Sequence, residues 1–444
     1  MSETPATGRR PLASEQCPDR PEPGPGASGR RGGRRTRGRG RWWGFAAGVL
    51  GVAVAVQAFR PLPAPALVMR DVPAHFTLPG GNAAVPWPSG GQGAVTVVGS
   101  GQMETFGEQR PVPIASTAKM MTAYVLLRDH PLKNRQDAGP QIEVDTQAVQ
   151  DGEAKDESRI EGLKVGQSYS EYDMLKMLMI PSGNNIARLV ARWDTRSDSV
   201  SAFVAKMNRA AAELGMTHTR YTDPSGLERE TVSTAVDQTR LAEAVMRSDA
   251  FRSVVSMAGA DISGAGKLYN NNSLLMSDLS VRGIKTGSNT PAGGALSWAA
   301  YKTVDGKDRL LLGTVLDQHA DGPDINGADS LKLVLENSRK IIEAVRGAVT
   351  SATIVEKGET VGYVDDGLGH RSPVVATKDV KGVGLRGTRL AIGLDQDAAR
   401  LPGEAKAGTV VGRLTVGEEP EAVPVALQHD LTEPSLLSRL TRLG

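Results

Sequence analysis

Residues 113–123 read Pro-Ile-Ala-Ser-Thr-Ala-Lys-Met-Met-Thr-Ala, and the serine and lysine in this stretch decide how the rest of the chain is interpreted. Two further short motifs follow in order, Ser-Gly-Asn at 182–184 and Lys-Thr-Gly at 285–287. Taken singly, they match an ordinary helix N-terminus, a turn and the end of a strand; the first two patterns are common by chance, and Lys-Thr-Gly is rarer. In this order, they indicate an acyl-transferring serine enzyme.

The first motif predicts a nucleophile and its base. If Ser116 begins a helix, Lys119 lies three residues later on the same face, beside the hydroxyl. A serine hydroxyl is a weak nucleophile until a base removes its proton. A lysine can be that base only if burial and a second cation, here expected to be Lys285, lower its pKa. The N–H groups of the helix N-terminus suit a developing oxyanion.

The second motif lies on a predicted loop, because Pro181 ends the preceding helix. Ser182 is expected to relay the proton to the leaving amine. Asn184 has both a donor and an acceptor, so it is expected to orient Lys119 and the substrate amide.

The third motif closes an apolar strand and is expected to bind substrate. Lys285 supplies a cation, and Thr286 supplies a hydroxyl for a terminal carboxylate. Gly287 lets the substrate backbone approach closely, and Ser288 can give the second oxyanion N–H.

The motifs and the residues around them resemble the serine D-alanyl-D-alanine carboxypeptidases, the low-molecular-mass penicillin-binding proteins. The resemblance runs from about Trp87 to Leu316, and its most similar stretches are 113–123, 182–187, 203–208, 214–216, 225–227, 233–235 and 283–287. Two positions depart from the family pattern. Asn185 stands where the family often has an acidic residue, and we expect this change to affect helix capping. Asn289 occupies the position of the usual threonine, and Thr290 lies one residue later.

The resemblance implies an α/β (α+β) fold like that of β-lactamases and penicillin-binding proteins. Its five-stranded antiparallel sheet has helices on both faces and a largely helical lobe, and here a small C-terminal all-β domain follows. It also implies removal of the terminal D-Ala from peptidoglycan stem peptides through an acyl-enzyme on Ser116. Penicillins are expected to acylate the same serine, and no metal or organic cofactor is implied.

Composition and patterning divide the 444 residues into segments. The predicted segments are a disordered basic tail (1–41), a transmembrane helix (42–59), a linker (60–86), the catalytic domain (87–347), a β domain (348–430) and a C-terminal tail (431–444).

Charge is unevenly distributed along the chain. Residues 1–41 contain ten arginines and four acidic residues, a balance of +6, so the remainder carries −4 of the total of +2. The high isoelectric point therefore gives no reason to expect nucleic-acid binding by the folded part. Cys17 is the only cysteine, which excludes an internal disulfide and thiolate metal sites and fits an exported protein.

The apolar segment 42–59 has three interpretations. Eighteen residues at 1.5 Å each give about 27 Å, enough to cross a bilayer core. The preceding arginines predict that the tail stays inside the cell and the bulk of the chain lies outside. A cleaved signal peptide, with a weak cleavage site at 56–58, and a buried soluble helix are the alternatives.

Local patterns predict the main elements. Helices are expected at 115–128, 170–180, 200–214, from Thr234, at 330–345 and at 434–443, with Ser170 and Thr234 as caps and Gly215 after a helix end. Strands are expected at 94–98, 281–286, 295–301 and 310–316, and in the C-terminal region at 352–355, 374–377, 389–392 and 410–416.

Four activities fit the motifs to different degrees. Carboxypeptidase activity is favoured, and endopeptidase activity on cross-links is a variant that these motifs do not separate from it. A class A β-lactamase needs a glutamate and a water for fast deacylation, and no Glu-x-x-Leu-Asn segment follows Ser182, while Glu213 falls within a predicted helix. A penicillin-binding scaffold without turnover would not need the intact motifs.

Overall fold

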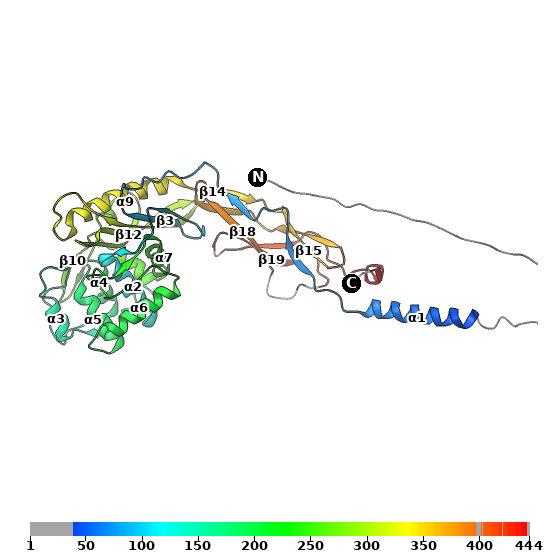
Figure 1. Cartoon of the computed structure of the whole chain (residues 1–444), viewed down its shortest axis with the longest axis horizontal. Helices are drawn as coiled ribbons and strands as arrows, with labels where there is room; N and C mark the ends of the chain where they lie inside the picture. Colours follow the sequence, from blue (N-terminus) through cyan, green and yellow to red (C-terminus); the bar gives the residue numbers. More distant parts are fainter. Residues whose placement is uncertain (1–38, 397–400, 402, 420, 442–444) are drawn as a thin grey trace, which may run out of the picture. The chain divides into compact units, whose positions relative to one another are not determined.

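The computed structural model describes residues 39–396, 401, 403–419 and 421–441 (Figure 1). One compact unit spans Leu62–Ser438, and the first helix belongs to a second unit. Most of the predicted basic tail, including Cys17, lies outside the described residues.

The first helix, α1 (Arg39–Phe59), begins three residues before the predicted apolar segment. Its window Trp42–Phe59 is long and apolar enough to cross a membrane, and none of it is buried in the protein. The buried-helix interpretation is therefore wrong. A membrane anchor and a signal sequence both remain compatible with this helix.

A five-stranded antiparallel sheet forms the centre of the catalytic region. Its strands lie in the order β11 (Val281–Asn289), β12 (Gly293–Val304), β13 (Lys307–Gln318), β3 (Gln92–Val97) and β4 (Met103–Phe106). All four strands predicted for this region are present. The strands β11, β12 and β13 are longer than predicted, and β3 begins two residues earlier and ends one residue earlier. The five-stranded sheet implied by the family resemblance is present.

Alternation of side chains gives this sheet two buried faces. Along β12, Trp298 packs with α9 (Ala328–Ala348), whereas Ala299 packs with the helical lobe. Figure 1 shows α9 on one side of the sheet and α2 (Lys119–Asp129) and α7 (Ala235–Val245) on the other. Because both faces are covered, the edge strand β11 can present catalytic side chains from a rigid support.

The helical lobe and its connections complete the catalytic region. Its elements are η1 (Ala115–Ala118), α3 (Thr146–Asp151), α4 (Glu171–Met179), α5 (Asn184–Thr195), α6 (Ser201–Glu213), α8 (Asp249–Val255), η2 (Ser273–Met276), η3 (Ile325–Gly327) and the short strands β5 (Val112–Pro113), β6 (Gln141–Glu143), β7 (Ser168–Ser170), β8 (Val232–Ser233), β9 (Gly259–Ile262) and β10 (Gly266–Tyr269).

Sequence patterns located the helix ends well. The Ser170 side chain accepts from the Asp173 N–H, and the Thr234 side chain accepts from the Asp237 N–H, as the capping motifs predicted. Gly215 follows α6 with φ +69, which a helix-ending glycine adopts without strain.

The C-terminal region is all-β, with its own apolar core. Its larger sheet contains β15 (Thr360–Asp365), β16 (Arg371–Ala376), β20 (Val423–Leu427), β19 (Val410–Val416) and β18 (Arg389–Gln396), and β14 (Val349–Val355) pairs with β17 (Val380–Leu385) in a second sheet. A short helix, α10 (Leu436–Thr441), follows.

The prediction that residues 60–86 form a linker is wrong in part. Strand β1 (Ala66–Met69) pairs with β15, and strand β2 (His75–Thr77) pairs with β18. Both strands supply partly buried apolar side chains to the C-terminal core. The proline-rich composition hid them, because strands of four and three residues are too short to show a clear alternating pattern.

Glu171, the first residue of α4, is buried without a hydrogen-bond partner on either carboxylate oxygen among the described residues. Burial raises the pKa of this carboxyl to about 8, with a further contribution from the Asp137 charge. The folded protein therefore holds a proton here under neutral conditions, on the helix that leads to the second motif.

We expect Glu171→Gln to remove a pH dependence of stability. Between an ordinary pKa of about 4.3 and the folded value of about 8, the folded state binds a proton that the unfolded state releases. The free energy of unfolding should therefore fall as pH rises through this window, and the variant should lose that fall. Urea unfolding at about pH 5.5 and about pH 8.5 measures it.

Glu143→Gln, an exposed substitution on β6, is the matched control and should keep the parent's pH dependence. If Glu171→Gln also keeps it, Glu171 is not protonated in the folded state.

Candidate active site

The sequence around Ser116 folds into a tight 3₁₀ turn that runs directly into α2. The Thr117 hydroxyl donates to the Ile114 carbonyl oxygen at 2.7 Å and so fixes the turn. Side chains three residues apart are nearly eclipsed in a 3₁₀ helix. As predicted, Lys119 lies beside Ser116, with 2.9 Å between Nζ and Oγ. Ser116 caps no helix, since the N-cap positions of η1 and α2 are Ile114 and Ala118.

Lys119 is completely buried at the N-terminus of α2. Its Nζ contacts Asn184 Oδ1 at 2.5 Å and the Ser225 carbonyl oxygen at 2.8 Å, in addition to Ser116. Burial lowers the pKa of Lys119 well below its ordinary value, and the neighbouring Lys285 charge lowers it further. Asp223 and Glu157 oppose this shift more weakly. The environment therefore favours a neutral amine.

The three contacts of Lys119 suit a neutral amine. Such an amine has two N–H donors and one lone pair. The Asn184 Oδ1 and the Ser225 carbonyl oxygen can only accept, so they take both donors. The lone pair is then left for Ser116, whose hydroxyl can donate to it. This arrangement suits a neutral Lys119 to accept the proton of the Ser116 hydroxyl, and its role as general base stays a prediction.

A buried aspartate fixes the Ser225 carbonyl. Asp223 Oδ2 accepts from the N–H groups of Ser225, Gly226 and Leu227, and Oδ1 accepts from the Thr231 hydroxyl at 2.7 Å. At Gly226, where φ is +79, a Cβ would collide with the Ala115 carbonyl oxygen. This loop therefore packs tightly against the turn that carries Ser116.

Asn184 is the first residue of α5 and connects Lys119 to a carboxylate. While Oδ1 faces Lys119, Nδ2 donates to Glu157 Oε2 at 2.5 Å. Arg188, one helical turn after Asn184, donates Nη2 to Glu157 Oε1 at 2.7 Å and Nε to Asp151 Oδ2 at 2.9 Å. Because a carboxylate only accepts, Glu157 fixes which end of the Asn184 amide faces the lysine.

Sequence reasoning missed Glu157 and assigned no role to Asp223. Glu157 lies in a charged loop, 27 residues before the asparagine that it contacts. The one available signal was the spacing of Asn184 and Arg188, which places both side chains on one face of α5.

Ser182 lies in the loop between α4 and α5. It is buried, has φ +71, and its hydroxyl has no hydrogen-bond partner among the described residues. An unpaired buried hydroxyl costs about 1–3 kcal/mol, and a positive φ at serine adds strain. Such costs are typical of functional positions, and the proton-relay role stays a prediction.

The third motif lies on β11, beside the turn that carries Ser116. Lys285 is almost fully buried, its Nζ donates to the Thr286 carbonyl oxygen at 2.9 Å, and burial lowers its pKa to about 7. A Cβ at Gly287 would lie 3.0 Å from the Ser116 nitrogen. Glycine therefore eases this close approach of strand and turn, because a Cβ here would press on the Ser116 backbone.

Ser116 opens into a cavity of about 270 Å³. The predicted site residues Ser116, Asn184 and Ser288 line it, whereas Lys119, Ser182, Lys285, Thr286 and Gly287 do not. The full lining is Ala115, Ser116, Lys155, Asp156, Glu157, Ser158, Asn184, Gly226, Leu227, Ser288, Asn289 and Asn326. The cavity thus brings the nucleophile, the orienting amide and Ser288 together. In the part of the chain that the structure describes, no group of three or more His, Cys, Asp or Glu side chains could hold a metal ion.

The two departures from the family pattern have structural roles. The expectation that Asn185 affects helix capping is wrong. Its side chain is buried and bonds the backbone of Ile160 and Ala148, which ties α5 to the preceding loop. Asn289 Oδ1 accepts from the Ala292 N–H and shapes the turn after β11, while Thr290 is exposed.

Comparison with known proteins agrees with this geometry. A family model described as D-alanyl-D-alanine carboxypeptidase matches residues 103–318. The D-alanyl-D-alanine carboxypeptidase DacB2 of Mycobacterium tuberculosis is 32% identical over 216 residues, 47% of this chain and 69% of that protein. A D-alanyl-D-alanine endopeptidase of Pseudomonas aeruginosa is 39% identical over 134 residues, which span 29% of this chain and 38% of the endopeptidase.

Among solved structures, penicillin binding protein 5 of Haemophilus influenzae aligns with a TM-score of 0.54 and 19% identity, over 81% of this chain and all of that one. This likeness confirms the predicted fold class.

We expect Glu157→Gln to shift the pH dependence of Ser116 acylation. The Glu157 charge raises the pKa of Lys119, so its removal lowers that pKa further. The neutral amine should then form at lower pH, and the rising limb of the acylation rate should move to lower pH. The plateau rate should fall on the order of tenfold, because glutamine holds the Asn184 amide less firmly. Stopped-flow acylation by benzylpenicillin across pH measures both effects.

Glu161→Gln is the control from the same loop, because Glu161 is exposed and, among the residues that the structure describes, pairs with Arg159 alone. Its pH profile should match the parent. An unshifted limb in Glu157→Gln would show that Glu157 does not act on Lys119.

Proposed function

The chain belongs to the D-alanyl-D-alanine carboxypeptidase family, and on that premise we propose that it removes the terminal D-alanine from peptidoglycan stem peptides. The observation that carries this proposal is the buried Lys119 amine, whose Nζ lies 2.9 Å from Ser116 Oγ and also contacts two fixed acceptors.

In the proposed reaction, Ser116 Oγ attacks the carbonyl carbon of the penultimate D-alanine as its proton passes to Lys119 Nζ. The N–H groups of Ser116 and Ser288 stabilise the oxyanion. Lys119 returns the proton through Ser182 to the leaving D-alanine nitrogen, and the C–N bond breaks. Water then hydrolyses the ester and regenerates Ser116.

The third motif supports cleavage at a free chain end. Thr286 follows Lys285 on β11, and a protonated Lys285 favours a terminal carboxylate at this strand. Relatives named carboxypeptidase and relatives named endopeptidase both match this chain. Cleavage of an internal cross-link is the second candidate, since it uses the same nucleophile and base.

The carboxylates of the site are not placed to activate a water for rapid hydrolysis of β-lactams. Glu157 lines the cavity, but Asn184 and Arg188 occupy both of its oxygens, so it is not free to activate a water. Glu213, at the end of α6, pairs with Arg128 in an exposed position. Deacylation of a penicilloyl-enzyme should therefore be slow.

The cell membrane is the proposed location. Helix α1 would anchor the chain, with the arginine-rich tail in the cytoplasm and residues 62–438 outside. Such an orientation would place the catalytic cavity on the side where peptidoglycan is found.

We expect benzylpenicillin to form a stable covalent adduct with the full chain and none with Ser116→Ala. The hydroxyl of Ser116 is the only group that the proposal uses as nucleophile, so D-alanine release from a D-Ala-D-Ala peptide should fall more than about 10³-fold. Intact-mass spectrometry and D-alanine release measure the two effects. A cross-linked dimeric peptide, assayed alongside, measures the endopeptidase reaction.

Ser273→Ala, which removes an exposed hydroxyl, should behave as the parent. A parent that leaves the drug intact and forms no adduct would be a binding module at most. A parent that destroys the drug without an adduct would be a β-lactamase, and the proposal would be wrong.

We expect Val52→Arg to release the protein from membranes, because an arginine at the centre of a membrane helix costs about 2.5–3.5 kcal/mol. Gln57→Arg, near the end of α1, should stay membrane-bound. Fractionation and the intact mass of the membrane-extracted protein measure these outcomes. A mature chain that begins near Ala58 would show instead that the segment is a cleaved leader.

A further inference from the structure

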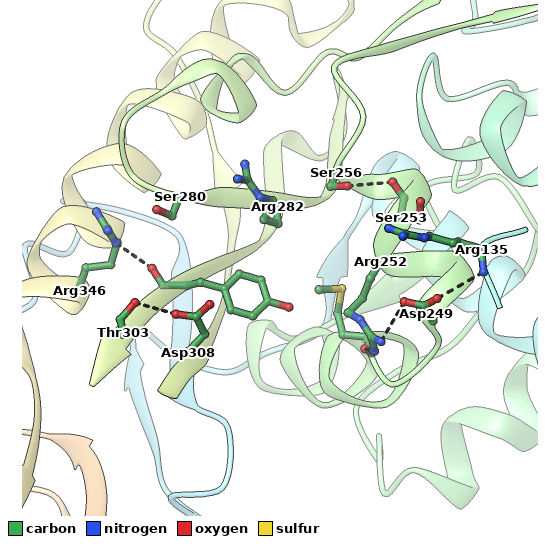
Figure 2. A pocket seen from close by; sticks show the side chains of 12 residues that line it. Arg135, Asp249, Arg252, Ser253, Ser256, Ser280, Arg282, Thr303, Asp308 and Arg346 are labelled. Atoms are coloured by element: carbon green, nitrogen blue, oxygen red, sulfur yellow. Dashed lines mark hydrogen bonds and ion pairs between the residues drawn. The ribbon is translucent and has the colours of Figure 1, made fainter. Parts of the chain in front are cut away.

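A second cavity, of about 550 Å³, lies at the opposite end of β11 from the catalytic motif (Figure 2). Its lining residues are Arg135, Met246, Asp249, Arg252, Ser253, Ser256, Ser280, Arg282, Tyr301, Thr303, Asp308 and Arg346. None of them lines the cavity at Ser116, so the two sites are separate.

Four arginines from four different segments converge on this cavity. Arg135 comes from the loop after α2, Arg252 from α8, Arg282 from β11 and Arg346 from the end of α9. Figure 2 shows Arg282 between the Arg135–Arg252 side and Arg346. With two aspartates among the lining residues, the formal charge is +2, four minus two.

The two aspartates leave most of this positive charge unpaired. Arg252 pairs with Asp249 at 3.3 Å, and Asp308 accepts a hydrogen bond from the Thr303 hydroxyl. Within the described ranges, no ion pair joins Arg135, Arg282 or Arg346 to a carboxylate.

Most donors of these three arginines are also unused. Arg282 Nη1 donates to the Val281 carbonyl oxygen at 3.2 Å, and Arg346 Nε donates to the Tyr301 carbonyl oxygen at 3.1 Å. Each guanidinium carries five N–H donors. The bond from Arg346 also holds its half-buried side chain in place.

Hydroxyl groups add donors among the arginines. Ser253 Oγ accepts from the Tyr172 hydroxyl at 3.1 Å, so its own proton is available to the cavity. Ser280, at the entry to β11, lies beside Arg282. The cavity is therefore lined by both charged guanidinium donors and neutral hydroxyl donors.

We propose that this cavity binds a phosphate group. A phosphate presents three or four acceptor oxygens and up to two negative charges, which match several guanidiniums at once. A single carboxylate has two oxygens and one charge, and would leave guanidiniums from the other segments unpaired. Within this proposal, the phosphate is carried as an ester, and its two possible sources are a soluble polymer and a phospholipid headgroup.

The first experiment compares binding of tripolyphosphate to the full chain in a neutral detergent with binding to Arg135→Gln/Arg282→Gln. Both substitutions remove exposed guanidiniums that make no ion pair. Titration calorimetry should show affinity reduced at least tenfold. Arg209→Gln, an exposed change on α6 outside the cavity, should bind as the parent does.

Two outcomes would overturn the proposal. One is an equal loss of affinity in Arg209→Gln, which would mean that only net charge matters. The other is binding of tricarballylate, a tricarboxylate, as tightly as tripolyphosphate. Benzylpenicillin acylation in the same samples reports on Ser116 separately, so failure here is distinguishable from failure of the proposed function.

A competition experiment then distinguishes a soluble phosphate ester from a phospholipid headgroup. Glycerol phosphate and dihexanoylphosphatidylglycerol, below its micelle concentration, are each titrated against bound tripolyphosphate. Equal competition supports a soluble phosphate ester, and tighter competition by the lipid supports a headgroup. Competition by neither contradicts a phosphate-ester site.

Discussion

The need to keep Lys119 neutral inside a folded protein constrains the whole catalytic region. An amine accepts a proton from serine only where water does not stabilise its charged form, and Lys119 is completely buried. Burial alone would leave its N–H groups unpaired, so two rigid acceptors are needed. The Asn184 side chain and the Ser225 carbonyl supply them from opposite parts of the helical lobe. The loop at Asp223 and the start of α5 therefore each position an acceptor for the same atom, Lys119 Nζ.

A second buried lysine strengthens this effect. Lys285 lies on the sheet, and its charge disfavours a proton on Lys119. Lys285 itself has a pKa of about 7 because of burial. Two carboxylates, Asp223 and Glu157, oppose this lowering of the Lys119 pKa. Each of them is hydrogen-bonded to groups other than Lys119. On balance the pKa of Lys119 is lowered, which favours the neutral amine.

How much the sequence predicted depends on the range of each interaction. The Ser116–Lys119 pair and the Ser170 and Thr234 caps are local, and short motifs predicted all of them. Glu157 meets Asn184 across 27 residues, and β1 finds its partner β15 almost 300 residues later. Such contacts leave no periodic signal in the sequence. Sequence patterns therefore reveal neither the role of Glu157 nor the strands within residues 60–86. Asn185 was misjudged because its partners lie in a distant loop.

Strand β11 contributes to both charged sites, with Arg282 in the arginine cavity and Ser288 in the cavity at Ser116. From Arg282 to Ser288 the chain advances six residues, or roughly 20 Å. The Debye length is about 8 Å under physiological conditions. A phosphate held by the exposed arginines is therefore largely screened from the cavity at Ser116. Binding there would act by holding the enzyme near a phosphate-bearing surface or polymer, while the chemistry at Ser116 continues undisturbed.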